Sequence, residues 1–262
     1  MRLPAWLKAA ALVGLALLAL PLIGLLSRVR YETLWQDLTS EAALNALGLS
    51  LLTAAGATLV CLVLGFPLAL LIARSSAKVA AVLRAVVLIP LVLPPMVGGL
   101  ALLSLLGRSG LLGQPLFEAT GFSLPYSTVG VVVAQVFVAM PFFVISVEGS
   151  LRTSGQGHEA VAASLGADRW RVLTRVTIPL VRPGLVAGTV LAFARAMGEF
   201  GATALFAGNT PGVTRTMPLA IYTAYNGVGV SQDTALALSL LLLVSAAVVV
   251  LGLRSWREDA VR

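Results

Sequence analysis

The sequence predicts an all-α membrane protein in which a single domain, residues 1–262, crosses the bilayer six times. Hydrophobic residues make up 58% of the chain and charged residues only 11%. A soluble domain usually carries about a quarter charged residues, so lipid must cover much of this surface. The apolar residues also form continuous runs of about 20 residues or more, enough for one helical crossing, rather than the alternating pattern of a barrel.

Six apolar runs give the expected transmembrane spans. They lie near residues 9–27, 45–73, 84–106, 127–149, 184–207 and 233–254. The first run follows a charged start, as in a signal peptide, but it is long and no clear small-x-small cleavage site follows it. We therefore interpret it as an uncleaved first span. The single cysteine, Cys61, lies inside the second run and is expected to be buried, without a disulfide or a metal.

The positive charges predict the orientation of the spans. With the N-terminus inside, the inner segments carry 13 of the 18 Lys and Arg residues, from Arg2 to Arg262, and the outer segments carry 4. Cytoplasmic loops retain Arg and Lys, so both termini are expected to be cytoplasmic. The net charge of +7 then reflects topology rather than nucleic-acid binding.

The third span contains an unusual set of prolines and glycines. Pro90, Pro94 and Pro95 are followed by Gly98 and Gly99. Proline bends a helix and frees backbone carbonyls, which a membrane protein tolerates where they face protein or water. A bend that only packs against other helices and a bend that lines a transport path both fit this pattern.

The longest inner loop, residues 150–183, is also the most charged segment of the chain. Residues 158–165 are rich in Ala and carry Glu159 near their start, where the helix dipole favours an acid. This pattern predicts a short helix. Gly166 is suited to its C-terminal end, because glycine tolerates the left-handed conformation that a helix cap often needs.

A basic and amphipathic segment, residues 169–178, follows this short helix. The residues on its apolar side are Trp170, Val172, Leu173 and Val176. Pro179 and Pro183 are expected to break the chain before the fifth span, because proline removes a helix hydrogen bond. An amphipathic loop that lies on the membrane surface remains an alternative interpretation of the whole stretch.

The stretch HEAVAASLGADRWRVLTRVTIPLVRPGL, residues 158–185, resembles the signature loop of the ABC importer permeases. That resemblance implies a type I ABC importer permease fold, in which a cytoplasmic coupling helix docks on a separate ATPase. The residues that it assigns to coupling are Glu159, Ala160, Ala162, Gly166, Ala167 and Pro179. The widespread pattern has Glu six residues before Gly, where this chain has Ala160, so the contact made by Glu159 itself is open.

The fifth span carries two charges, which are costly inside a membrane. Arg195 and Glu199 are four residues apart, so they are expected to share a helix face and to pair, and Thr203 extends that polar stripe. The small residues of the same segment, Ala194, Gly198 and Ala202, are expected to form a face for close helix approach. A lining for anion passage and an ion pair that only fixes the helix both fit these residues.

The segment RAMGEFGATALFAGNTPGVTRTMPLAIY, residues 195–222, is similar to the oxyanion branch of these permeases, and most similar to the molybdate permeases. Residues 88–113 also resemble their third span. The resemblance implies a homodimer in a bacterial or archaeal plasma membrane, with a cytoplasmic ATPase dimer and an extracytoplasmic oxyanion-binding protein as partners. Molybdate is the expected cargo, with tungstate or sulfate as alternatives. Residues expected on the path or in its scaffold are Pro94, Pro95, Gly98, Arg195, Glu199 and Thr203.

The remaining features give smaller predictions. A short interfacial helix is expected near residues 216–225, where Tyr222 and Tyr225 suit the membrane interface, and with residues 107–126 it would form the outer rim. Glu148, at the inner end of the fourth span, is expected to reach the interface or to pair with Arg152.

Two other classes of protein compete with the importer hypothesis. An ion-coupled secondary transporter would need acids at mid-membrane, and only Glu199 qualifies. A membrane enzyme would need a catalytic set that the spans lack. No G-x-x-x-x-G-K-[ST] phosphate loop occurs, so this chain is expected to be non-catalytic and without a cofactor, and ATP hydrolysis would belong to another subunit.

Overall fold

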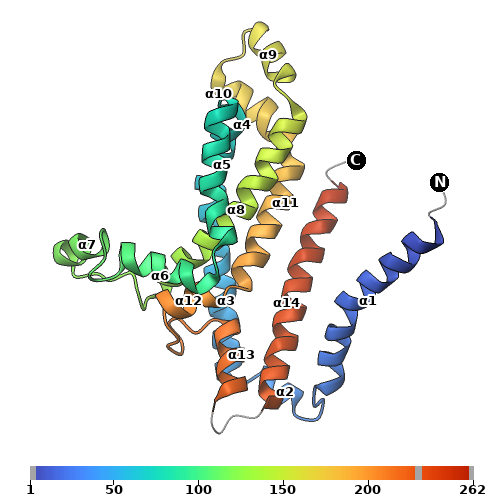
Figure 1. The fold of residues 1–262 in the computed structure, drawn as a ribbon, viewed down its shortest axis with the longest axis vertical. Coiled ribbons are helices and arrows are strands. Elements are labelled where there is room, and N and C mark those ends of the chain that lie inside the picture. The colour runs from blue at the N-terminus through green and yellow to red at the C-terminus, as the bar shows by residue number, and fades with distance from the viewer. Residues whose placement is uncertain (1–3, 228–231, 260–262) are drawn as a thin grey trace.

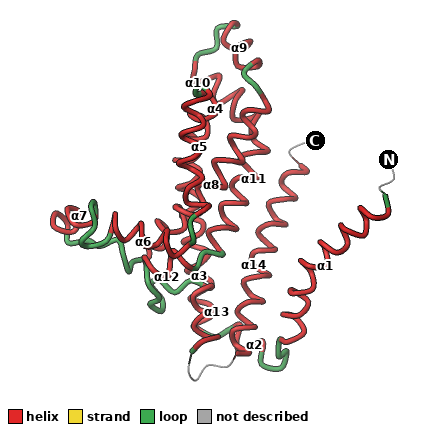
Figure 2. The backbone as a smooth tube through the Cα atoms, in the orientation of Figure 1, coloured by secondary structure: helices red, strands yellow, loops and turns green. Residues whose placement is uncertain are grey.

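The structure, a computed structural model, describes residues 4–227 and 232–259. Within these residues every regular element is a helix, as Figure 2 shows. The all-α prediction is therefore confirmed. Arg2 and Arg262, which the charge balance includes, lie outside the described residues.

The helices follow one another along the chain with short connections (Figure 1). In order they are α1 (Ala5–Arg28), α2 (Leu34–Leu38), α3 (Glu41–Val60), α4 (Phe66–Arg74), α5 (Ala77–Val92), α6 (Pro95–Leu106), α7 (Gly113–Thr120), α8 (Thr128–Ser154), α9 (Gly157–Ser164), α10 (Arg169–Val172), α11 (Ile178–Met197), α12 (Gly201–Phe206), α13 (Met217–Asn226) and α14 (Gln232–Asp259). Two π-helical turns, η1 (Cys61–Gly65) and η2 (Leu173–Thr177), join α3 to α4 and α10 to α11 without a gap.

Among the described residues, four helical stretches are long and apolar enough to cross a membrane. They are Ala5–Arg28, Glu41–Arg74, Thr128–Ser154 and Arg169–Met197. A fifth crossing results if the bent pair α5 and α6 counts as one span. The apolar helix Gln232–Val248, within α14, is shorter than these four stretches. The chain is thus a membrane protein with several apolar helices. Three of them lie at the positions expected for the first, second and fourth spans, and the fourth stretch, Arg169–Met197, begins 15 residues before the expected fifth span.

The third expected span, residues 84–106, does not form one helix. Its two parts, α5 and α6, meet at 112° across a two-residue break. Leu93 and Pro94 have extended backbones at this corner, because a residue before proline is driven away from the helical region. Pro90 lies inside α5 without ending it. The predicted proline bend is confirmed, but it is a corner that sends α6 sideways from the bundle (Figure 1).

The expected break at Pro179 and Pro183 is wrong. The helix runs through both prolines, from Arg169 to Met197. Pro179 lies in the first turn of α11, directly after the π-helical turn η2. Proline is tolerated at this point because the π-helical turn has already shifted the hydrogen-bond ladder.

The fifth expected span, residues 184–207, is instead interrupted at residues 198–200. Helix α11 ends at Met197 and α12 begins at Gly201, so the small residues Ala194, Gly198 and Ala202 do not share one helix face. Gly198 is the C-terminal cap of α11, and Phe200 has a non-helical backbone. The predicted small-residue face is therefore wrong, because the glycine ends the helix.

The core of the bundle lies where α8 and α11 pack along each other, beside α3 and α4 (Figure 1). A Cβ atom on Gly188 would lie 3.1 Å from the carbonyl oxygen of Phe143, so glycine permits this close approach. The Ser146 hydroxyl donates to the Gly184 carbonyl oxygen at 3.1 Å and ties the two helices together. Cys61 is buried in the same core, as expected.

The two ends of the bundle carry different elements (Figure 1). Helix α9 lies at one extreme, beyond the ends of α4 and α8, and α2 and α13 lie at the other. Helix α13 confirms the helix expected near residues 216–225, and its Tyr222 and Tyr225 side chains are exposed. Arg30 and Asp233 form an ion pair of 3.2 Å at the α2 end.

Candidate functional site

Helix α9 confirms the short helix that the Ala-rich segment predicts. It spans Gly157–Ser164 and is followed by Gly166, whose φ of +84° is left-handed. The Gly166 N–H donates to the Ala163 carbonyl, and the Ala167 N–H donates to the Ala162 carbonyl, both at 3.0 Å. These two bonds close the last turn, so Gly166 has the capping role expected from sequence.

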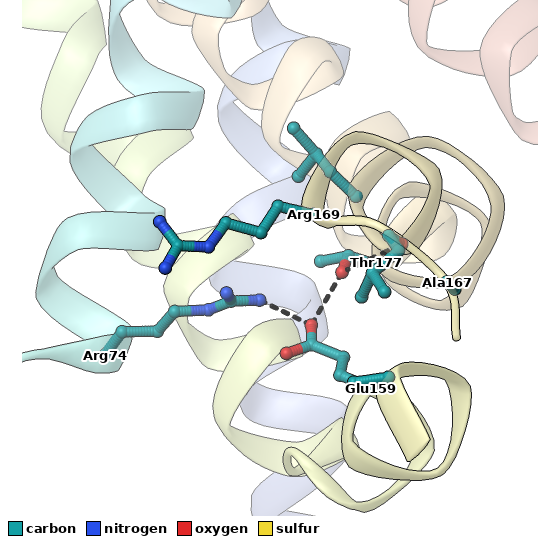
Figure 3. A pocket seen from close by; sticks show the side chains of 8 residues that line it. Arg74, Glu159, Ala167, Arg169 and Thr177 are labelled. Atoms are coloured by element: carbon teal, nitrogen blue, oxygen red, sulfur yellow. Dashed lines mark hydrogen bonds and ion pairs between the residues drawn. The ribbon is translucent and has the colours of Figure 1, made fainter. Parts of the chain in front are cut away.

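Glu159 faces inward from α9, toward the bundle. Its Oε1 atom lies 2.5 Å from an Nη atom of Arg74, at the end of α4. The same oxygen accepts a hydrogen bond of 2.6 Å from the Thr177 hydroxyl, at the end of η2 (Figure 3). The Glu159 side chain is only 14% exposed and Thr177 is buried. We call these three residues the Glu159 junction.

The outer side of the same loop exposes large apolar side chains. Val161, Leu165 and Trp170 are 60%, 83% and 72% exposed. The other apolar residues expected on the face of Trp170, namely Val172, Leu173 and Val176, are half-buried. A loop that faced only water would not gather such side chains at its tip, so this surface is suited to cover by another molecule.

A cavity of about 300 Å³ lies between α9 and the start of the α10–α11 helix. Its lining residues include Arg74, Glu159, Ala167, Arg169 and Thr177 (Figure 3). Arg169 forms no ion pair with any described residue. Arg74 is therefore the cation paired with Glu159 in this cavity, and Arg169 lines the cavity without such a pair.

Glu148 has a partner that sequence reasoning missed. Arg84 on α5 contacts both of its oxygens, at 2.5 Å and 3.2 Å, and Arg152 lies 3.6 Å away, as the four-residue spacing predicts. Glu148 is buried. A buried carboxylate in an apolar helix needs a cationic partner. The sequence therefore indicates that Glu148 must be paired, but it does not identify Arg84 as the partner.

Arg195 and Glu199 do pair, at 2.7 Å, although they do not share one helix. The second Glu199 oxygen accepts the backbone N–H of Ala202 at 2.8 Å, in the first turn of α12. Glu199 is 1% exposed. Its carboxylate therefore joins the end of α11 to the start of α12. Thr203, expected to continue the polar stripe, is buried in α12, and its hydroxyl has no hydrogen-bond partner among the described residues.

The corner at Pro94 and Pro95 packs against this same break. A Cβ atom on Gly201 would lie 2.7 Å from the Cβ atom of Pro95, and one on Gly99 would lie 2.9 Å from the Cβ atom of Leu205. Gly98 is buried against the Phe137 ring. The structure thus brings the expected residues of the third and fifth spans together, away from the α9 end (Figure 1).

Known proteins resemble this chain over most of its length. The sequence pattern of the family described as "Binding-protein-dependent transport system inner membrane component" matches residues 65–256. The molybdenum transport system permease protein ModB of Mycobacterium tuberculosis is 51% identical over 250 residues, which cover 95% of this chain and 93% of that protein. The protein of the same name from Escherichia coli is 38% identical over 212 residues, covering 81% and 92%.

A solved structure with the same fold supports this match. A chain of a bacterial alginate ABC transporter, in complex with an alginate pentasaccharide-bound periplasmic protein, matches with a TM-score of 0.71 and 20% identity. The match covers 95% of this chain and 92% of that one. The resemblance to ABC importer permeases, and to molybdate permeases among them, is confirmed. The chain belongs to the family of binding-protein-dependent transport system inner membrane components.

Proposed function

We propose that this chain is the permease subunit of an importer that carries molybdate into the cytoplasm, driven by a separate ATPase. The observation that carries the proposal is the tip of the α9 loop. It exposes Val161, Leu165 and Trp170 while Glu159 is held on the inner side. A helix that is anchored on one side and exposes an apolar face on the other is suited to dock in a groove of another protein. The molybdenum permeases that share about half of its residues support the cargo.

The proposed assembly contains two copies of this chain, a cytoplasmic ATPase dimer and an extracytoplasmic oxyanion-binding protein. The binding protein is supported by the name of the family. The alginate transporter, whose permease chain has the same fold, is itself described in complex with a periplasmic protein. The ATPase is supported by the family's ABC character and by the absence of a phosphate loop from this sequence.

The proposed topology has six crossings with both termini in the cytoplasm. The bent pair α5–α6 supplies the third crossing and α14 the sixth, and the α9 end faces the cytoplasm. Arg74, Arg84 and Arg152 lie in the inner segments, in keeping with the retention of positive charge in the cytoplasm. The start of α1 also points toward the α9 end (Figure 1).

In this proposal the Arg195–Glu199 ion pair stabilises the helices beside the anion path and does not bind the anion. We call this ion pair the frame of the path. Both Glu199 oxygens are already used, one by Arg195 and one by the Ala202 N–H. The corner at Pro94, Pro95 and Gly98 rests on the same frame. The partly exposed Arg195 side chain is then a polar group available near a passing anion, whereas Thr203 is buried behind the frame.

A secondary transporter coupled to an ion gradient is the competing function. It needs an acid in the membrane that can release and rebind its ion. The one candidate expected from the sequence, Glu199, is tied in an ion pair, and so is the buried Glu148 near the end of α8. That pairing favours the ATP-driven function.

The test is to purify the tagged chain from its native host and to ask whether an ATPase purifies with it. The complex is then placed in liposomes with its binding protein, and ATP turnover is measured with molybdate, tungstate or sulfate. Molybdate is expected to stimulate turnover most. No ATPase in the preparation, together with proton-driven uptake by the chain alone, would overturn the proposal. An equal or better response to sulfate would overturn the cargo.

A further inference from the structure

The Glu159 junction connects three parts of the chain that are far apart in sequence. Glu159 belongs to α9, Arg74 ends the long helix Glu41–Arg74, and Thr177 lies in the long helix Arg169–Met197. Both contacts end on the same oxygen, Oε1, at 2.5 Å and 2.6 Å (Figure 3). One carboxylate therefore fixes α9 to the ends of two membrane-crossing helices.

Few other contacts hold α9 against the membrane-crossing helices. Helix α9 has only eight residues and none of them is buried. It is flanked by Gly155 and Gly166, both with left-handed φ angles of +65° and +84°. Without the junction, a displacement of α9 could be absorbed by rotation at these two loops instead of moving the bundle.

The Glu159 side chain also points away from the exposed apolar surface that is proposed to dock on the ATPase. A helix turns about 100° per residue, so Val161 lies roughly 200° round α9 from Glu159. Val161 is 60% exposed, whereas the Glu159 side chain is 14% exposed. Ala160, at the position where the resemblance places the usual acid, is exposed. The acid of this chain is thus turned away from the surface that a partner would cover.

We propose that Glu159 is a positioning residue that carries the displacement of α9 to α4 and α11 through Arg74 and Thr177, and that it does not contact the ATPase. The inference rests on the proposed function, since it assigns the element that links docking to the membrane helices. A charge-assisted bond with a buried hydroxyl beside it is short and directional, as a mechanical connection requires.

The experiment uses the full complex in liposomes and compares three variants with the wild type. Glu159→Gln and Arg74→Gln each remove the ion pair, and the exchange Arg74→Glu with Glu159→Arg restores it in reverse. Asp168→Asn is the matched control, because it removes a charge from the same loop and keeps a good helix cap for α10. The readouts are the amount of ATPase that co-purifies and the ATP hydrolysed per anion transported.

Both single variants are expected to retain the ATPase and to hydrolyse more ATP per anion transported than the wild type. The exchange is expected to recover most of the wild-type ratio, and the control to match the wild type. A merely structural role would lower yield and all activities together without changing this ratio.

Three results would overturn the inference. Loss of the ATPase from Glu159→Gln but not from Arg74→Gln would mean that Glu159 docks on the partner. An unchanged ratio in both single variants, or no recovery by the exchange, would mean that the pair carries no displacement. A wild-type chain that neither retains an ATPase nor transports with ATP would overturn the proposed function as well. The wild type is therefore measured before any variant, so that this outcome is separated from the others.

Discussion

Arg84 on α5 donates a hydrogen bond to each carboxylate oxygen of Glu148 on α8, with N–O distances of 2.5 Å and 3.2 Å. Glu148 is buried, and the Arg84 side chain is one-third exposed. Removing one partner of such a pair leaves an uncompensated charge, whereas replacing both by apolar residues is often tolerated.

Arg84→Met is therefore expected to destabilise the protein by about 1–3 kcal/mol, less than a fully buried pair would give because Arg152 remains nearby. The double variant Arg84→Met with Glu148→Leu is expected to be closer to the wild type. Thermal unfolding in detergent measures both. A double variant at least as unstable as Arg84→Met alone would contradict this account.

Glu199→Gln is expected to reduce the melting temperature, because it weakens the bond to Arg195 and the cap of α12 at once. The matched control is Glu118→Gln on the exposed helix α7, which should leave stability unchanged. Arg195→Lys, which keeps the charge, is expected to retain uptake with an unaltered apparent affinity for the anion. A large loss of that affinity would instead make Arg195 part of the cargo site.

Leu165→Ser is expected to weaken the association with the ATPase about 30-fold or more, the loss typical of an interface hot spot, since Leu165 is 83% exposed at the tip of the loop. The fold of the Leu165→Ser variant should be unaffected, because so exposed a side chain contributes little to packing. Leu111→Ser, at a similarly exposed leucine near α7, is the control and should retain the ATPase. Pull-down of the ATPase by each variant gives the comparison. Equal retention of the ATPase by both variants would show that the exposed tip around Leu165 is not part of the docking surface.

Gly166→Val is expected to uncouple ATP hydrolysis from transport, because a branched residue is strained at a φ of +84° and the last turn of α9 would open. Gly166→Asn is the matched variant, since asparagine tolerates this conformation, and it should retain most of the coupling. Uptake per ATP in liposomes separates the two. Normal coupling in Gly166→Val would mean that the geometry of this cap is not needed.

Gly201→Val is expected to destabilise the packing of α12 on α6 by about 1–3 kcal/mol, because even a Cβ atom there would lie 2.7 Å from the Cβ atom of Pro95. Gly149→Val is the control in α8, where a Cβ atom meets nothing within 4 Å. Melting temperatures of the two variants should differ clearly. The same melting temperature in both would show that the corner can move away at little cost.

Local signals were enough to predict several of these features. The Ala-rich segment and Gly166 predict α9 and its cap because a helix end depends on a few neighbouring residues. The run of prolines in the third span predicts a bend, but the 112° angle depends on what α6 packs against. The π-helical turn before Pro179 has no sequence signature of its own, so the predicted chain break there was wrong.

The contacts of the acids were harder to predict because they are long-range. Arg74 lies 85 residues from Glu159, and Arg84 lies 64 residues from Glu148. Nothing in the spacing of these residues indicates their pairing. The Arg195–Glu199 pair was predicted from its four-residue spacing, but the break between them was not, because Gly198 was counted as a packing residue rather than as a helix end.

The close approach of α8 and α11 has a mechanical consequence. Gly184 and Gly188 of α11 lie against α8, and the Ser146 hydroxyl bonds to the Gly184 carbonyl oxygen across the contact. Sliding one helix along the other would break this bond and disturb a close-packed core. We therefore expect α8 and α11 to tilt together when Thr177 is displaced.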